Sequence, residues 1–351
     1  MARLITHGWE SGNLYEQGSI NNIQSNPATP PALLSSGARS GNYAASFQIN
    51  LYGNSAIGHG EWVSLPINGN PSEIYIRVGV RVITPTGYGK YLVMIRDGGT
   101  NQVTLDVTTG GTFEARCGST VLGRGGVATT NAWTCIEIRI KVDPSAGIMQ
   151  VWQDGVLIIS FTGNTRSSAA SQINAVLLGW MNTISTNETS IVALDDIAIN
   201  DTTGTVNNGR IGQGGIYPLF PIADTPDKDF ARSGGADNYI LVNSIMADDE
   251  ATYVQDGLVG DRDLYSIQSL SGGSGSIIDV VTVIAKARAA GGTGVRIGLT
   301  TLTGSSVAIG SMEQLVNAYG YKLQAWEREP SGVSSWTIGA VQSLQIGVTI
   351  L

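Results

Sequence analysis

Two adjacent acidic residues, Asp195 and Asp196, interrupt the apolar run ALDDIAIND at residues 193–201. The run has the alternation of a β-strand, in which every second side chain points to the same face. An unbroken strand would place Asp195 in one row with the apolar residues Ile191 and Ile197. A buried carboxylate without a partner costs several kcal/mol, so the sequence predicts that something pairs with Asp195.

Two kinds of partner fit this position. Calcium binds clustered carboxylate and carbonyl oxygens, and the acidic pair is followed by Asn200 and Asp201. Asp195 and Asp196 are therefore the candidate Ca²⁺ ligands of this chain, and a structural Ca²⁺ ion is the one cofactor that the sequence suggests. The alternative is hydrogen bonding of Asp195 to backbone N–H groups or to an arginine. We favour this alternative because the dense acidic spacing of calcium-binding loops is absent.

Cysteine and histidine offer little further chemistry. Cys117 and Cys135 are the only cysteines, and we expect both to be buried thiols in a reducing compartment. A disulfide between neighbouring strands is the alternative. The two histidines, His7 and His59, are too few and too far apart for a histidine-based metal site or proton relay.

Two polar segments could be mistaken for binding sites. MADDEATYV at 246–254 contains Asp248, Asp249 and Glu250, which could bind a cation or a basic neighbour. Three successive acidic residues more often form a solvated turn, which we expect here. LSGGSGS at 270–276 is rich in glycine but lacks the Lys-Ser/Thr pair of a phosphate-binding loop, so we expect a turn there too.

Four tryptophans are candidates for stacking against sugar rings: Trp62, Trp133, Trp152 and Trp180. Exposed aromatic faces of this kind bind saccharides in lectin-like sandwiches, whereas buried ones pack in the core. We expect at least three of the four in the core and assign no glycan-binding residue.

The composition indicates many short strands joined by tight turns. The chain has 351 residues, 46 glycines, only 14% charged residues and a net charge of −8. The negative charge argues against a nucleic-acid partner. The chain also contains no run of about 18 apolar residues that could insert into a membrane. Because the N-terminus lacks the apolar segment of a signal peptide, we expect folding in a cytoplasm.

Period-two alternation locates the elements that must position these residues. It is strict over 72–83 and 134–143, which predicts strands with one buried and one wet face. Residues 147–163 read as a hairpin around Asp154 and Gly155, the pair that a type I′ turn requires. We expect about a dozen strands before residue 200, packed as two sheets of a jelly-roll sandwich: 44–51, 61–65, 73–83, 90–97, 101–107, 112–122, 134–142, 147–153, 156–162, 173–181 and 191–199.

A second domain follows a polar stretch. We place a first β-sandwich at 1–205, a flexible linker at 206–216 and a smaller β-domain for assembly or docking at 217–351. In that domain the run 277–290 alternates as a strand, and 311–321 is the one predicted helical turn.

Several segments in order resemble the laminin-G and concanavalin A-like sandwiches of bacteriophage structural proteins: GWESG (8–12), SGNYA (40–44), IYIRVGVRV (74–82), TCIEIRIKVDPSAGIMQVWQDG (134–155) and ALDDIAINDTTG (193–204). The run SSWTIGAVQSLQIGV at 334–348 is similar to the closing segment of the second β-domain in those proteins. The resemblance implies an all-β concanavalin A-like sandwich followed by a second, smaller β-sandwich. It also implies a virion component, such as a tail fibre, capsid decoration or baseplate protein, assembled in the host cytoplasm.

The function implied by the resemblance is structural and not enzymatic, with other virion proteins and further copies of this chain as partners. The alternative is a receptor protein whose first sandwich binds host surface polysaccharide. A polysaccharide-degrading enzyme is the third hypothesis, and we expect no such activity. Glycoside hydrolases on sandwiches of this class carry a strand pattern E-x-D-x-x-E, which places two carboxyl groups on one face. The chain has no such run, and Glu137 is followed on its face by Arg139 and Lys141.

Overall fold

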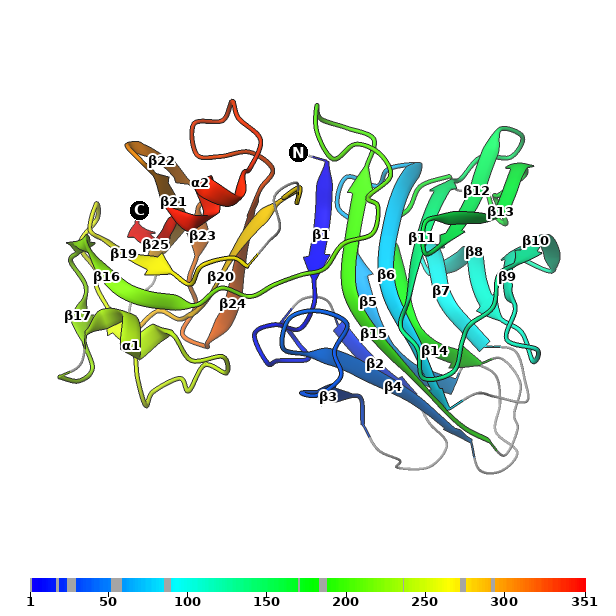
Figure 1. Ribbon diagram of the computed structural model, residues 1–351, viewed down its shortest axis with the longest axis horizontal. Helices are drawn as coiled ribbons and strands as arrows, with labels where there is room; N and C mark the ends of the chain where they lie inside the picture. The colour runs from blue at the N-terminus through cyan, green and yellow to red at the C-terminus, as the bar shows by residue number, and fades with distance from the viewer. Residues whose placement is uncertain are drawn as a thin grey trace. The chain divides into compact units, whose positions relative to one another are not determined.

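The computed structural model describes residues 2–16, 19–23, 30–51, 59–84, 90–169, 171–182, 188–235, 237–271, 276–291 and 294–351. In these ranges the regular secondary structure is almost entirely β-strand, with two short helices (Figure 1). It divides into two compact units, Met1–Tyr217 and Pro218–Leu351. The predicted all-β fold, a jelly-roll sandwich followed by a smaller β-domain, is confirmed.

The first unit contains an eight-stranded antiparallel sheet in the order β13-β12-β11-β6-β15-β4-β3, with β1 also paired to β15. Long alternating strands occupy its centre, as the sequence predicts. The strands are β1 (Arg3–His7), β3 (Ala32–Leu34), β4 (Ala44–Leu51), β6 (Glu73–Thr84), β11 (Thr134–Lys141), β12 (Gly147–Gln153), β13 (Val156–Gly163) and β15 (Glu188–Asp201).

A seven-stranded antiparallel sheet forms the other layer of this unit, in the order β10-β9-β8-β7-β14-β5-β2. Its strands are β2 (Ser19–Ile23), β5 (His59–Pro66), β7 (Lys90–Asp97), β8 (Thr100–Val107), β9 (Phe113–Cys117), β10 (Thr120–Gly125) and β14 (Ala175–Asn182). The single strand predicted over 112–122 is in fact β9 and β10. Gly118, with φ 57°, turns the chain between them, in a backbone region that favours glycine.

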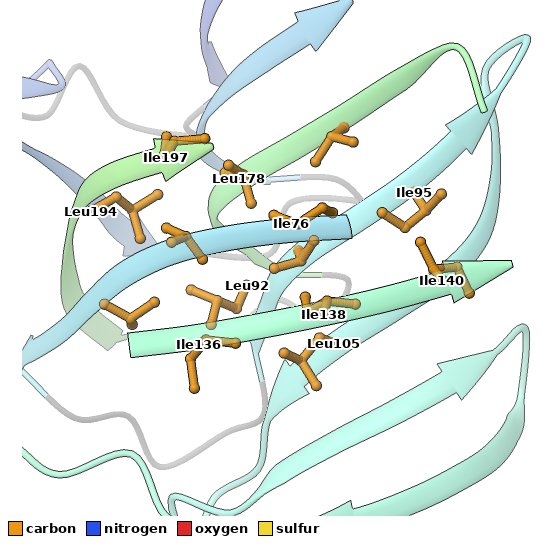
Figure 2. Packing of buried hydrophobic residues seen from close by; sticks show 14 of the residues in the cluster. Ile76, Leu92, Ile95, Leu105, Ile136, Ile138, Ile140, Leu178, Leu194 and Ile197 are labelled. Atoms are coloured by element: carbon orange, nitrogen blue, oxygen red, sulfur yellow. The ribbon is translucent and has the colours of Figure 1, made fainter. Parts of the chain in front are cut away.

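The core lies between the two sheets and is built from the alternate residues of each strand. Ile76 and Ile138 are direct partners on β6 and β11, and their exposed fractions are 1% and 2%. Figure 2 shows them facing Leu92 and Leu105 of the other sheet. Each such side chain stabilises the fold by about 1.5–3 kcal/mol on burial. The predicted shared apolar layer is therefore present.

The turn between β12 and β13 is the predicted two-residue hairpin. Gln153 pairs with Val156, which leaves Asp154 and Gly155 as the loop. Both have positive φ, 48° and 85°, as a type I′ turn requires. Asp154 also accepts a hydrogen bond from the Cys135 backbone N–H at 2.8 Å, which ties the hairpin to β11.

Strand β15 departs from the unbroken alternation expected from its sequence. Asp196 has φ 53°, and the pairing of β15 with β6 shifts register between Asp195 and Ala198. This β-bulge inserts one extra residue, so Leu194 and Ile197 both reach the core, whereas Asp195 points to the opposite face. The predicted row of Ile191, Asp195 and Ile197 is therefore wrong.

The second unit is smaller, and its two buried apolar clusters are smaller than the core of the first unit. Its six-stranded sheet runs β16-β19-β25-β21-β22, with β23 also paired to β21, and β17–β18 and β20–β24 form two-stranded ribbons. The strands are β16 (Pro221–Lys228), β17 (Ala231–Arg232), β18 (Val254–Gln255), β19 (Arg262–Ile267), β20 (Val281–Ala287), β21 (Arg296–Thr303), β22 (Ser306–Ile309), β23 (Glu313–Gln314), β24 (Gly320–Trp326) and β25 (Gln345–Ile350).

The helices of this unit lie elsewhere than predicted. They are α1 (Asn238–Val242) and α2 (Ile338–Gln342), whereas 311–321 contains β23 and the start of β24. The Thr337 side chain caps α2 by accepting a hydrogen bond from the Ala340 N–H. Neither helix is long or apolar enough to cross a membrane, a finding that covers the described part of the chain.

Candidate functional site

The outer face of the seven-stranded sheet carries an apolar cluster separate from the core. Met94, Leu177 and Met181 are buried there, and Trp62 and Tyr91 pack against them while remaining partly exposed. These residues come from the adjacent strands β5, β14 and β7. We call the five side chains the aromatic platform. It presents two partly exposed rings on a packed apolar floor.

Glycine at position 179 allows Trp62 to lie on this face. Gly179 is the cross-strand partner of Trp62. A Cβ atom on Gly179 would lie 2.6 Å from Trp62 Cα and 2.8 Å from Trp62 Cβ, which is closer than real contacts allow. Any side chain at this position would displace the tryptophan or its strand.

Four charged side chains continue the same face across β8, β9 and β10. Asp106 is paired with Tyr91 on one side and with Glu114 on the other, and Glu114 is paired with Arg124. Arg116 lies two residues further along β9 and is paired with Thr104. We call Asp106, Glu114, Arg116 and Arg124 the charged group. It begins where the aromatic platform ends.

Ion pairs hold the charged group together. Glu114 accepts hydrogen bonds from Nε of both Arg116 and Arg124. Arg116 Nε also lies 3.5 Å from Asp106 Oδ2. The side chains of Arg116 and Arg124 remain 31% and 60% exposed, so guanidinium N–H groups reach solvent above the buried carboxyl groups.

Asp106 is the titratable member of this group. Burial raises its pKa to about 7, although the Thr104 hydroxyl and the Arg116 guanidinium oppose the rise. Asp106 Oδ1 and Thr104 Oγ1 are both buried. A carboxyl group with a pKa raised in this way changes its charge near neutral pH, and the guanidinium groups beside it can bind anions.

The acidic pair Asp195 and Asp196 lies on β15 of the eight-stranded sheet and not on this outer face. Asp195 accepts hydrogen bonds from the backbone N–H groups of Arg39 and Asp196, at 2.8 and 2.7 Å. Asp196 accepts from Arg39 Nη1 and Ser40 Oγ, each at 2.5 Å, and from the Ile216 N–H at 2.6 Å. Both aspartates are fully buried. Their oxygens thus face donors and a guanidinium, which is the hydrogen-bonded alternative that the sequence left open.

Glu10 adds a third carboxyl group to this buried region. Its Oε2 accepts a hydrogen bond from the Asn42 N–H at 2.7 Å. Burial, together with the nearby Asp195 and Asp196, raises the pKa of Glu10 to about 8. Burial and the neighbouring Asp196 likewise raise the pKa of Asp195 to about 7. Among the described residues, no group of three His, Cys, Asp or Glu side chains is arranged to hold a metal ion.

Residues 209–216, within the predicted linker, lie along the outer face of the eight-stranded sheet, and we call them the strap. Arg210 forms two hydrogen bonds with the buried Glu137 and lies over the Trp152 ring, with its Cζ 4.7 Å from the ring centre. The Gly212 N–H also donates to Glu137, and the Gly214 carbonyl accepts from Arg39. The expected flexible linker is thus held by polar contacts that hydropathy patterning does not detect.

The four tryptophans are distributed differently from our expectation. Trp180 lies in the core, with its Nε1 donating to Ser190 Oγ at 2.5 Å. Trp62, Trp133 and Trp152 are partly exposed. The expectation that at least three are core residues is wrong, because Trp133 and Trp152 lie against arginine side chains and Trp62 packs in the cluster on the outer face.

The other candidate residues have structural contacts. Cys117 and Cys135 are buried free thiols, as expected. In the acidic segment, Asp249 pairs with Lys286 and Glu250 with Arg288, each at 2.5 Å. The centre of the glycine-rich run 270–276 lies outside the described residues.

The chain is similar to known proteins in structure. No protein-family model and no curated protein sequence matches the chain. A cellulose-induced protein is similar to it, with 18% identity over 60% of this chain and all of that one and a TM-score of 0.46. An endo-β-1,4-glucuronan lyase from the fungus Trichoderma reesei has 13% identity over 56% of this chain and 95% of that one, with a TM-score of 0.46. An alginate lyase has 12% identity over 53% of this chain and 98% of that one, with a TM-score of 0.36.

These similarities correct one expectation. We excluded enzyme activity because the chain lacks an E-x-D-x-x-E run, but solved structures similar to it include polysaccharide lyases. The exclusion is therefore wrong, since a missing hydrolase pattern says nothing about lyases. The virion assignment stays a prediction from the resemblance.

Proposed function

We propose that the first unit binds a polysaccharide chain on the outer face of its seven-stranded sheet, across the aromatic platform. The observation that carries the proposal is the pair of partly exposed rings, Trp62 and Tyr91, supported by three buried apolar side chains. Sugar rings have apolar C–H faces and polar edges, and ligand sites of this kind combine aromatic surfaces with a few placed polar groups. The charged group supplies such polar groups next to the rings.

The contacts on the opposite sheet support this choice of face. The strap occupies part of the outer face of the eight-stranded sheet and uses Trp152 for its own packing against Arg210. Trp133 similarly stacks with Arg81 and donates to the Gly37 carbonyl at 3.0 Å. These two tryptophans therefore have partners within the chain, whereas Trp62 and Tyr91 lie on a surface that a ligand could cover.

The test is binding of the full chain to a panel of soluble acidic and neutral polysaccharides, measured by calorimetry. We expect Trp62→Ala to weaken binding about tenfold, or about 1.4 kcal/mol, because one stacking surface is lost. Trp133→Ala is the matched control, since it removes a partly exposed tryptophan from the other side, and it should bind as the wild type does. Absence of binding to every polysaccharide, or equal binding by both variants, would overturn the proposal.

A second readout separates binding from turnover. The same mixtures are examined for shorter chains by size-exclusion chromatography and for the ultraviolet absorbance of unsaturated uronates, the products of lyases. Shortened products that depend on Trp62 would show that the face also carries a reaction.

A further inference from the structure

The charged group and the aromatic platform form one continuous surface. Tyr91 and Asp106 are cross-strand partners, and the side chains of directly paired residues lie about 5 Å apart. From Trp62 on β5 to Arg116 on β9 there are four strand spacings of about 4.8 Å, or about 19 Å in all. A ligand that lies across the rings therefore reaches the guanidinium groups without a gap.

The charge of this surface depends on Asp106. Arg116 and Arg124 contribute two positive charges and Glu114 one negative charge, so the group carries one net positive charge while Asp106 is protonated. Ionisation of Asp106 brings the sum to zero. Burial of the Asp106 carboxyl disfavours its charged form. The groups that face it are Tyr91 on β7 and Glu114 and Arg116 on β9, with Arg124 behind them on β10.

We propose that Arg116 and Arg124 bind a carboxylate of an acidic polysaccharide that lies on the aromatic platform, and that the proton on Asp106 controls the strength of this binding. The inference rests on the function proposed above and adds the ligand class and its regulation. With Asp106 protonated, a ligand carboxylate meets two guanidinium groups and one carboxylate. With Asp106 ionised, it meets a second buried negative charge beneath Arg116, and binding weakens.

The pKa of Asp106, about 7, places the change in binding affinity within a pH range that is easy to measure. The probes are polygalacturonate oligomers and the same oligomers with their carboxyl groups reduced to alcohols. We expect the acidic oligomer to bind about five- to tenfold more weakly at about pH 8.5 than at about pH 5.5. The reduced oligomer should bind equally at both values, because it carries no charge.

Two variants test the assignment of the residues. Asp106→Asn keeps the shape of the side chain but cannot ionise, so binding of the acidic oligomer should become independent of pH. Arg124→Gln should weaken the acidic oligomer at both pH values and leave the reduced one unchanged. Retention of the wild-type pH dependence by Asp106→Asn would overturn the role of the proton.

The failure of this inference is distinguishable from failure of the proposed function. If both oligomers bind equally at both pH values and Trp62→Ala weakens both, the carboxylate site is wrong and polysaccharide binding stands. If neither oligomer binds and no polysaccharide of the panel binds, both are overturned.

Discussion

Arg210 and Glu137 form a two-point ion pair, with Nε–Oε2 at 3.1 Å and Nη2–Oε1 at 2.6 Å, 73 residues apart in the chain. Glu137 lies on β11, and its side chain is 2% exposed. Arg210 belongs to the strap. The pair therefore joins a segment without secondary structure to the centre of the eight-stranded sheet.

Removal of this pair should destabilise the first unit. We expect Arg210→Ala to lower its free energy of unfolding by about 1.5–3 kcal/mol, because the buried Glu137 carboxylate loses its guanidinium partner. The measurement is a urea titration with hydrogen exchange of the β11 amides as the readout. Arg166→Ala is the control, since Arg166 donates to a backbone carbonyl in a surface loop, and its effect should stay within about 0.5 kcal/mol. Equal effects of the two variants would contradict the prediction.

Stability of the first unit should fall as the pH rises. The folded-state pKa values of Glu10 and Asp195, about 8 and about 7, lie above their ordinary values of 4.5 and 3.8. The folded state therefore holds protons that the unfolded state has released, so the stability is full below about pH 4 and is lost up to about pH 8. We expect a decrease of several kcal/mol over this window in urea midpoints, and no further decrease from these groups above it.

A variant assigns the pH effect to this carboxyl cluster. Glu10→Gln cannot ionise, so its stability should fall less steeply between about pH 4 and about pH 8 than that of the wild type. An identical pH profile for the two proteins would show that other groups are responsible.

Calcium should have little effect on the first unit. The carboxylate oxygens of Asp195 and Asp196 accept hydrogen bonds from backbone N–H groups, from Ser40 and from Arg39, whose positive charge opposes a cation. We expect thermal midpoints to agree within about 1 °C in chelator and in millimolar calcium, since a ligand stabilises only the state that binds it. A clear rise on calcium addition would instead support the metal alternative.

The two cysteines should react only when the fold opens. Burial raises the pKa values of both thiols, Cys135 to about 11, which lowers the thiolate fraction that reacts. We expect slow reaction with a thiol-specific disulfide reagent in native buffer and rapid reaction of both thiols in denaturant. Failure to titrate two thiols after unfolding would contradict the free-thiol assignment.

Much of the first unit follows from local pattern. Ile76 and Ile138 could be assigned to the core because strict alternation over 72–83 and 134–143 leaves one choice of buried face. The bulge at Asp196 could not be predicted, because an aspartate in the left-handed region leaves no trace in hydropathy. The short strands β1 to β3 were missed, since tertiary pairing and not propensity determines them.

The candidate site could not be predicted for a different reason. Asp106, Glu114 and Arg124 lie on strands that local patterns locate, but their grouping depends on strand pairing and on which outer face is left accessible. The sequence instead points to Asp195 and Asp196, which are neighbours in the chain. Contiguous acidic residues attract notice, whereas a site assembled across a sheet has no signature in a single sequence.

The strap determines where the first unit can be cut for separate expression. A fragment that stops at residue 205, the boundary suggested by composition, would leave the Glu137 carboxylate without Arg210 and would remove the Ile216 N–H from Asp196. Such a fragment should be prone to aggregation for reasons unrelated to its core. A fragment that extends through Tyr217 retains both contacts. Inclusion of residues 206–217 therefore decides whether the sandwich can be purified alone.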